Sequence, residues 1–169
     1  MKKPFIMLMM SSCLLLTPSM AQVVVNDPVA TSQAVITCGN ARFTVLTPEM
    51  IRVEYSEQAK FEDRATFTIV NRKLDAPQFT KSEDDTYLYI TTSNLKLKYR
   101  KGTDPRTLPA SPSNLTITIS GNGVSSVWYP GKPDPLNLKG TSRTLDGLMG
   151  ESKRAEMENG LVSRSGWAV

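Results

Sequence analysis

The stretch ARFTVLTPEMIRVEYS, residues 41–56, decides the fold class, because apolar and polar residues alternate along both of its halves. Phe43 and Val45 fall on one face of the first half, and Ile51, Val53 and Tyr55 fall on one face of the second half. A period of two residues is the pattern of a half-buried β-strand. The break at Pro48 separates the two runs, so the stretch predicts two short strands.

The same alternation recurs along the chain, whereas helical periodicity is nearly absent. Turn-forming residues such as Gly39-Asn40 and Gly121-Asn122-Gly123 separate the alternating runs. The further runs are ATFTIV (65–70), with Phe67 and Ile69 on one face, TYLYITT (86–92), LKLKYRK (95–101) and LTITIS (115–120). Seven or eight short strands at this spacing predict an all-β fold, specifically an antiparallel β-sandwich.

The N-terminal segment has the layout of a secretory signal peptide over residues 1–21. Two lysines precede an apolar run from Phe5 to Leu16, and small residues lead to a cleavage position after Ala21. We therefore expect export to the periplasm or the medium, with one domain over residues 22–169. Lipidation at Cys13 is the alternative, but the apolar run continues beyond this cysteine, whereas a lipid-modified cysteine should close it.

The composition excludes several kinds of chemistry. The chain has no histidine, so Ser-His-Asp sites, Cys-His sites and the usual zinc sites are excluded. Cys38 is the only cysteine left after the signal peptide, which rules out an internal disulfide. No aspartate spacing suited to calcium appears, and we predict neither a metal nor a cofactor. Any catalysis would depend on carboxylates.

The charge argues against a nucleic acid or a membrane surface as the partner. The net charge of +4 falls to +2 when Lys2 and Lys3 leave with the signal peptide. The alternating lysines of LKLKYRK could form a basic stripe for nucleic acid. Lysines on the solvent face of a sheet are common, however, and also discourage aggregation through strand edges, so we favour that interpretation.

After Tyr129 the composition changes, and the rest of the chain is predicted to be a long C-terminal loop. Prolines stiffen its start, and the part that follows is rich in Gly, Ser, Thr and charges of both signs. Asp146 and Glu151 form a possible carboxylate pair for glycoside hydrolysis, but neither stands in an apolar context that would raise its pKa. Contact with a sugar is the milder hypothesis, through Arg143, Asp146 and Trp167.

Two segments of the chain resemble a known enzyme family. NLKGTSRTLDGLMGE (137–151), followed by GLVSRSGWAV (160–169), is similar to the end of the N-terminal domain of glycoside hydrolase family 31, the α-glucosidase and α-xylosidase group. The bacterial members carry a Leu-Gly-Gly-Thr-x-Arg-Thr-Leu-Asp-Gly stretch and then Leu-Ser-Arg-x-Gly-Trp. NARFTVLTPEMIRVEYS (40–56) resembles the first core strands of that domain. The resemblance covers about residues 35–169, and Lys139 stands where the family usually has a glycine.

The resemblance implies a galactose mutarotase-like sandwich that packs against a (β/α)8 catalytic barrel. One loop of this domain reaches over the active site of the barrel, and its acidic residue touches the sugar. The matching residue here is Asp146, with Arg143 holding the loop. The catalytic aspartates of the family lie on the barrel, so no residue of residues 1–169 is assigned a catalytic role.

Two functions of different classes follow from these observations. In the first, the chain is the accessory N-terminal domain of an exported α-glycosidase that acts on α-linked oligosaccharides, is inactive alone and supports a barrel outside this sequence. In the second, it is a stand-alone carbohydrate-binding or interaction module. Trp167 distinguishes them: an accessory domain should leave an exposed apolar patch around this side chain, and a complete module should cover it or display it in a groove. In the first case we also expect the Trp167 to Val169 end to fray.

Overall fold

The computed structural model describes residues 26–106, 114–121, 123–140 and 157–169. These residues form eight β-strands in two antiparallel sheets, together with one turn of 3-10 helix, η1. The three-stranded sheet follows η1 (Ser32–Ala34) and contains β1 (Val35–Cys38), β2 (Ala41–Thr47) and β3 (Met50–Tyr55). The five-stranded sheet contains β4 (Thr80–Glu83), β5 (Tyr87–Thr91), β6 (Leu95–Arg100), β7 (Leu115–Gly121) and β8 (Val124–Trp128).

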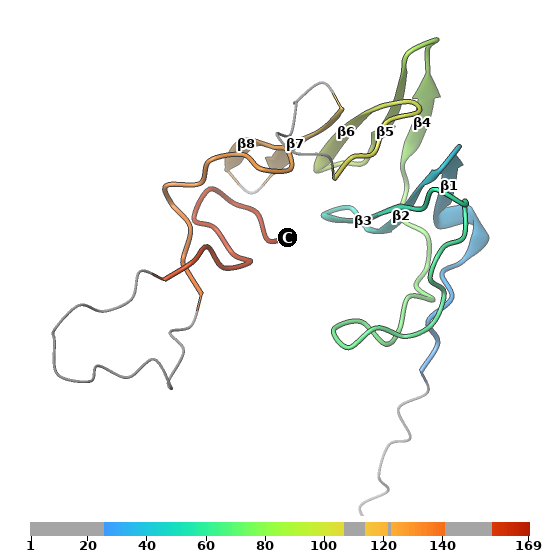
Figure 1. The fold of residues 1–169 in the computed structure, drawn as a ribbon, viewed down its shortest axis with the longest axis horizontal. Helices are drawn as coiled ribbons and strands as arrows, with labels where there is room; N and C mark the ends of the chain where they lie inside the picture. The colour runs from blue at the N-terminus through green and yellow to red at the C-terminus, as the bar shows by residue number, and fades with distance from the viewer. Residues whose placement is uncertain (1–25, 107–113, 122, 141–156) are drawn as a thin grey trace, which may run out of the picture.

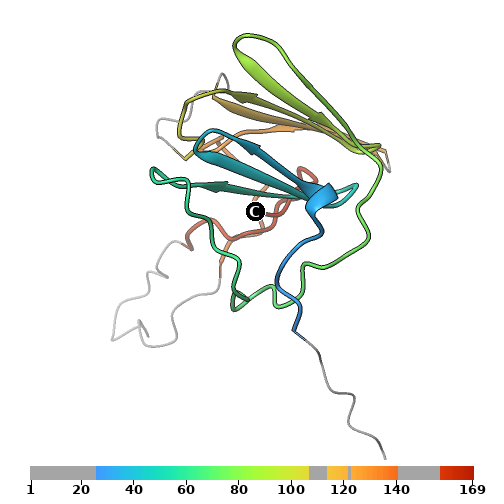
Figure 2. The ribbon, with the colours of Figure 1, turned by 90° about the vertical axis from the view of Figure 1, so that its right-hand side faces the viewer.

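The two sheets face each other and enclose the core, as the prediction of an all-β antiparallel sandwich requires (Figures 1 and 2). Strands that are consecutive in the chain are also neighbours in each sheet, so both sheets are simple meanders. Phe43 on β2 and Tyr99 on β6 meet in the centre, with ring centroids 5.0 Å apart and an interplanar angle of 58°. Such a tilted arrangement of rings is a favourable one.

Alternation along the strands explains which side chains reach the core. Phe43 and Val45 on β2 are fully buried, and so are Leu88 and Ile90 on β5. The residues between them on β5 point to the outer face of the five-stranded sheet, since successive side chains of a strand point to opposite faces. The strand predictions for residues 41–47, 50–56, 86–92, 95–101 and 115–120 are therefore confirmed.

The prediction of a strand at residues 65–70 is wrong. This segment belongs to the connection between β3 and β4, and Phe67 is fully exposed. Thr66 closes a turn with Ile69, because its backbone N–H donates to the Ile69 carbonyl at 3.0 Å and its hydroxyl accepts from the Ile69 N–H at 3.2 Å. The local hydroxyl group thus satisfies the backbone groups that a neighbouring strand would have paired.

The 56–79 connection covers the outer face of the three-stranded sheet. Thr44 lies on that face, between the core residues Phe43 and Val45, and is nevertheless buried, at 2% exposure. The sheet is therefore packed on both sides, by the five-stranded sheet and by this connection. A hydrogen bond joins the β5–β6 turn to the β2–β3 turn, since the Thr92 hydroxyl donates to the Pro48 carbonyl at 2.6 Å.

The part of the chain after Trp128 contains no regular strand among the residues that the structure describes, in agreement with the predicted long C-terminal loop. Residues 157–169 lie on the side of β7 and β8 that faces the three-stranded sheet, as both views show. Across the described ranges, no helix is long or apolar enough to cross a membrane. The predicted signal peptide and Cys13 lie outside these ranges.

Candidate functional site

The predicted sugar-contact residues divide into one that the structure describes and two that it does not. Trp167 is described, whereas Arg143 and Asp146, like Glu151, lie outside the described residues. The chain on either side of residues 141–156 is described, however. We therefore build the site from that flanking structure, which we call the stem (residues 136–140 and 158–164).

Backbone hydrogen bonds hold the two halves of the stem side by side. The Leu138 N–H donates to the Val162 carbonyl at 3.0 Å, and the Arg164 N–H donates to the Leu136 carbonyl at 3.0 Å. Gly140, the last described residue before the 141–156 segment, is paired in the same way, because its N–H donates to the Glu158 carbonyl at 2.8 Å. The described residues that flank the 141–156 segment are therefore paired with each other.

Asn137 organises the stem from within. Its side-chain oxygen accepts hydrogen bonds from the backbone N–H groups of Lys139 and Gly160, both at 2.8 Å. Its amide nitrogen donates to the Gly160 carbonyl and to Asp134, both at 3.0 Å. One amide side chain thus uses both its donor and its acceptor groups on the stem.

Asp134 joins the stem to the C-terminal turn. One carboxylate oxygen accepts from the Ser163 hydroxyl at 2.7 Å, and the other accepts from Asn137. Partial burial raises the pKa of Asp134, but the hydrogen bonds from Ser163 and Asn137 together outweigh it and hold this pKa below its ordinary value. The carboxylate is therefore ionised and fully engaged, and acts as a structural acceptor.

Lys139 has the backbone conformation of a glycine. Its φ is +67°, in the left-handed region that residues with a Cβ rarely adopt. Opposite it, Gly160 has no room for a side chain, since a Cβ there would lie 2.4 Å from the Lys139 carbonyl oxygen. The stem therefore requires a left-handed residue at 139 and a glycine at 160.

Trp167 lies at the end of the stem and is half-buried. Its carbonyl accepts from the Ser163 N–H at 2.9 Å, and the Lys132 ammonium lies 4.9 Å from its ring centroid. The Val169 N–H donates to the Leu161 carbonyl at 2.9 Å, so the expected frayed end is instead paired with preceding residues. Aromatic and cationic groups are together suited to a sugar ring with a polar substituent.

The sequence predicted Trp167 but not Lys132, Asp134 or Asn137. These three residues have partners 23 to 35 residues away in the chain, at Gly160, Ser163 and Trp167. The only local signal was the stiff connector rich in proline around Asp134, which marks the start of the loop without indicating what the carboxylate binds.

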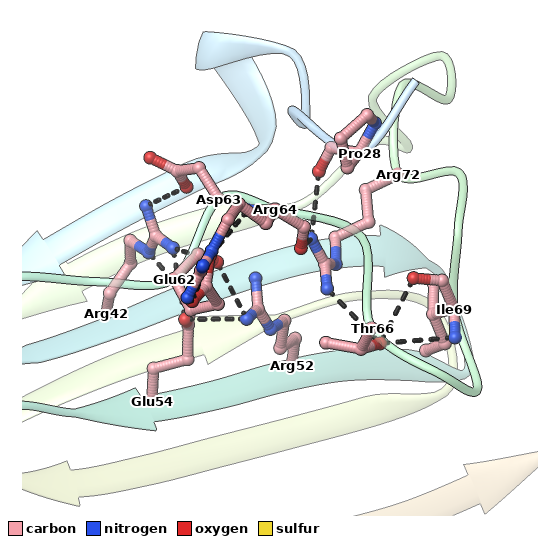
Figure 3. Close-up of polar contacts among 10 residues, drawn as sticks. All are labelled: Pro28, Arg42, Arg52, Glu54, Glu62, Asp63, Arg64, Thr66, Ile69 and Arg72. Atoms are coloured by element: carbon pink, nitrogen blue, oxygen red, sulfur yellow. Dashed lines mark hydrogen bonds and ion pairs between the residues drawn. The ribbon is translucent and has the colours of Figure 1, made fainter. Parts of the chain in front are cut away.

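A second polar cluster lies where the 56–79 connection crosses the three-stranded sheet (Figure 3). Arg42 and Glu54 face each other across β2 and β3 and form a bidentate ion pair at 2.8 and 3.0 Å, and Arg42 also binds Asp63 at 2.7 Å. Burial lowers the pKa of Arg42, but its hydrogen bonds to Glu54 and Asp63 together raise it. These pairings anchor the connection and leave no free carboxylate between the two strands.

Arg72 anchors the same connection to the N-terminal segment. It is 2% exposed, and its guanidinium donates to the carbonyls of Pro28 and Arg64, both at 3.0 Å (Figure 3). Its Nε is buried and has no hydrogen-bond partner among the described residues. Its acceptors among the described residues are all uncharged oxygens of the chain itself, and they tie three segments together, so its role is structural.

The described residues show no group prepared for acid–base or metal chemistry. Every described carboxylate with a clear shift has a lowered pKa: the Arg64 hydrogen bond brings the pKa of Glu62 to about 2, and Asp84, Asp104 and Asp134 shift the same way. A proton-donating carboxyl needs the opposite shift. Burial raises the pKa of the Cys38 thiol, so it stays protonated. Within the described ranges no cluster of three metal-ligating side chains occurs.

No family model matches this chain, and a search of curated proteins finds no similar sequence.

Proposed function

We propose that this chain is the accessory N-terminal domain of an exported α-glycosidase similar to glycoside hydrolase family 31. In this role it supports a separate catalytic barrel and presents Arg143, Asp146 and Trp167 to an α-linked oligosaccharide. The observation that carries the proposal is the stem. Its two halves pair at Gly140 and Glu158, which flank the segment with Arg143 and Asp146, and Trp167 pairs with Ser163 of the stem.

The backbone at Lys139 supports the resemblance on which the proposal rests. The family pattern has a glycine at this position, and here the backbone keeps a φ of +67° although the residue is lysine. A left-handed residue is what a glycine in a pattern of related sequences indicates. The substitution therefore leaves the geometry of the stem consistent with the family pattern.

The surface around Trp167 favours an accessory domain over a complete module. The Val169 N–H donates to the Leu161 carbonyl, and Val162 follows Leu161 in the chain. Leu161, Val162 and Val169 are 70%, 48% and 60% exposed. Adjacent exposed aliphatic side chains mark a surface that another protein surface covers. We assign this surface to contact with the barrel.

Activity measurements test the accessory role. Because the described residues contain no carboxyl prepared to donate a proton, we expect the purified chain to release no nitrophenol from 4-nitrophenyl α-glucoside or α-xyloside above the buffer rate. Turnover by the chain that disappears in Asp146→Asn would contradict the accessory role. A barrel encoded in frame directly after the Val169 codon would support it.

The alternative, a stand-alone carbohydrate-binding module, is favoured by the half-exposed ring of Trp167 next to Lys132. Calorimetry with maltotriose and a xyloglucan oligosaccharide distinguishes the two functions. Binding by the isolated chain that is lost in Trp167→Ala and retained in Phe67→Ala supports the module. Phe67 is a matched control, because it is a fully exposed aromatic residue at another site. Absence of binding to both sugars supports the accessory role.

A further inference from the structure

The outer face of the five-stranded sheet carries a set of side chains that the proposed function does not use. The register of β5, β6 and β7 places three kinds of residue in adjacent rows. We call this surface the β5–β7 outer face; its rows are Tyr87, Tyr89 and Thr91 on β5, Lys96, Lys98 and Arg100 on β6, and Thr116, Thr118 and Ser120 on β7.

The middle row is cationic and unpaired. Lys96, Lys98 and Arg100 are all exposed, and none has an ion-pair partner within the described part of the chain. The three residues alternate along β6 and so span about 13 Å. Asp84 is the carboxylate next to the tyrosines, and it already accepts from the backbone of Tyr87 at 2.7 Å and from the Tyr89 hydroxyl at 2.9 Å.

The β5 row supplies aromatic rings beside these cations. The ring centroids of Tyr87 and Tyr89 are 6.2 Å apart, and the Lys98 ammonium lies 3.9 Å from the centroid of the Tyr87 ring. The hydrogen bond from Tyr89 to Asp84 limits the motion of the Tyr89 ring. Both tyrosines are half-buried, so each is held in place and still presents a surface.

An open groove of about 690 Å³ adjoins this face. Thr91 belongs to both, since it lines the groove and pairs with Lys96 across β5 and β6. The lining contains no ionisable side chain and includes Gln33, Gln78, Phe79, Thr80, Thr91 and Ser93. Among the described residues, the side-chain amides of Gln33 and Gln78 make no hydrogen bond. Amides and hydroxyls both donate and accept, as sugar hydroxyls do.

From these observations we propose that the β5–β7 outer face and the adjoining groove bind an acidic polysaccharide. The cations on β6 pair with its carboxylates, the tyrosines contact its rings, and the uncharged groove holds a neutral, hydroxyl-bearing part of the chain. A nucleic acid fits less well, because it carries a phosphate at every nucleotide and the groove offers no cation. The site is independent of the proposed function, since the stem lies on the other side of the five-stranded sheet.

Calorimetry with a hyaluronan hexasaccharide, an acidic hexamer in which glucuronic acid alternates with neutral N-acetylglucosamine, tests this proposal, with neutral maltohexaose and a dT10 oligonucleotide as comparison ligands. We expect the wild-type protein to bind the acidic hexamer more tightly than either comparison ligand. Lys98→Gln should weaken this binding by up to about fivefold, the range of a single exposed ion pair. With three cations, the slope of log affinity against log salt concentration should be no steeper than about −3.

Lys60→Gln is the matched control, because Lys60 is an exposed lysine on the connection that covers the other sheet, and it should leave the affinity unchanged. Circular dichroism checks that each variant is folded. No binding of the acidic hexamer, or equal affinity for it in wild type and in a combined Lys96→Gln, Lys98→Gln and Arg100→Gln variant, would overturn the proposal. Tighter binding of dT10 than of the acidic hexamer would also overturn it, in favour of a nucleic acid. All these outcomes leave the tests of Trp167 and Asp146 unaffected.

Discussion

At the scale of single residues, Lys139 shows a conflict between local preference and tertiary structure. A residue with a Cβ in the left-handed region costs about 1–2 kcal/mol. The stem nevertheless imposes this conformation, since the Asn137 side chain accepts from the Lys139 N–H and Gly140 is paired with Glu158. The cost at one residue is thus offset by the hydrogen bonds around it.

Replacing Lys139 by glycine should therefore stabilise the protein. We expect Lys139→Gly to raise the free energy of unfolding by roughly 0.5–1 kcal/mol, because the relief of backbone strain exceeds the added entropy of the unfolded chain. Urea denaturation followed by tryptophan fluorescence measures this. Lys139→Ala is the control, since it removes the same side chain and keeps the strain. A stabilisation of equal size in both variants would show that the side chain, and not the backbone, is responsible.

Asp84 gives a prediction about pH. Backbone hydrogen bonds from Tyr87 and Thr86, with a further bond from the Tyr89 hydroxyl, lower the pKa of Asp84 in the folded protein. A carboxylate with a lowered folded pKa stabilises the protein above its unfolded pKa of about 3.9, and this contribution is lost as the pH falls through the folded pKa. Asp84→Asn should therefore be less stable than wild type at pH 7.

The stability difference between wild type and Asp84→Asn should shrink as the pH is lowered from 5 towards 2. Urea unfolding of both proteins across this range measures it. Asp85→Asn removes the same charge at the neighbouring residue, which is exposed, and should change stability little at any of these pH values. A difference for Asp84→Asn that stays constant down to pH 2 would rule out the ionised carboxylate as its cause.

At the scale of elements, the strands differ in how strongly their own residues specify them. β6 alternates strictly between buried and exposed residues, from Leu95 to Arg100, and its sequence alone predicts it. β4 was not predicted, because all four of its residues are exposed and carry no apolar signal. It exists because β5 offers a free edge with which Thr80 to Glu83 can pair. The 65–70 segment has the alternation of a strand but no partner of this kind.

The stem also depends on partners distant in the chain, and Gly160 is its most sensitive position. A Cβ at residue 160 would clash with the backbone of Lys139, which cannot move away as a flexible side chain could. We expect Gly160→Ala to destabilise the stem by about 1–3 kcal/mol, as overpacking does elsewhere. Faster amide hydrogen exchange at Leu138 and Gly140 would report this, because their N–H groups pair across the stem.

Gly102→Ala provides a comparison for Gly160→Ala. Gly102 also resists substitution, through its φ of +76°, but it lies in the five-stranded sheet region and has open space around it. Its replacement should lower global stability without a selective effect on exchange at Leu138 and Gly140. If Gly160→Ala left exchange at these two amides unchanged, the stem would not need the close approach that the structure shows.

At the scale of the whole molecule, the sequence predicted the sandwich better than it predicted the site. Alternation is a local property, so each core strand could be read without knowing its neighbours. The site depends on where distant segments meet. A motif predicts Trp167, but Lys132 and Asp134 belong to the site only because they contact Trp167 and Ser163, about 30 residues further along the chain. No local pattern encodes such a return.

The exposed apolar surface of the stem and C-terminal turn should make the isolated protein associate with itself. We expect Leu161→Glu to reduce association at high concentration, measured by sedimentation velocity, and to change the free energy of unfolding by less than about 0.5 kcal/mol, because Leu161 is 70% exposed. Gln58→Glu adds the same charge at another exposed residue and should have no such effect. Equal association in all three proteins would exclude this surface as the cause.

The anchor at Arg72 has a consequence for the order in which the protein can be completed. Arg72 holds the carbonyl of Pro28, a residue made 44 positions earlier, and its backbone N–H donates to the neighbouring Asp27 carbonyl at 2.8 Å. During synthesis the chain around Pro28 emerges first and has nothing to bind until residue 72 has followed it. An enzyme that acts near Pro28 before residue 72 is made therefore meets a segment without these hydrogen bonds. An enzyme that acts later meets a segment held by them.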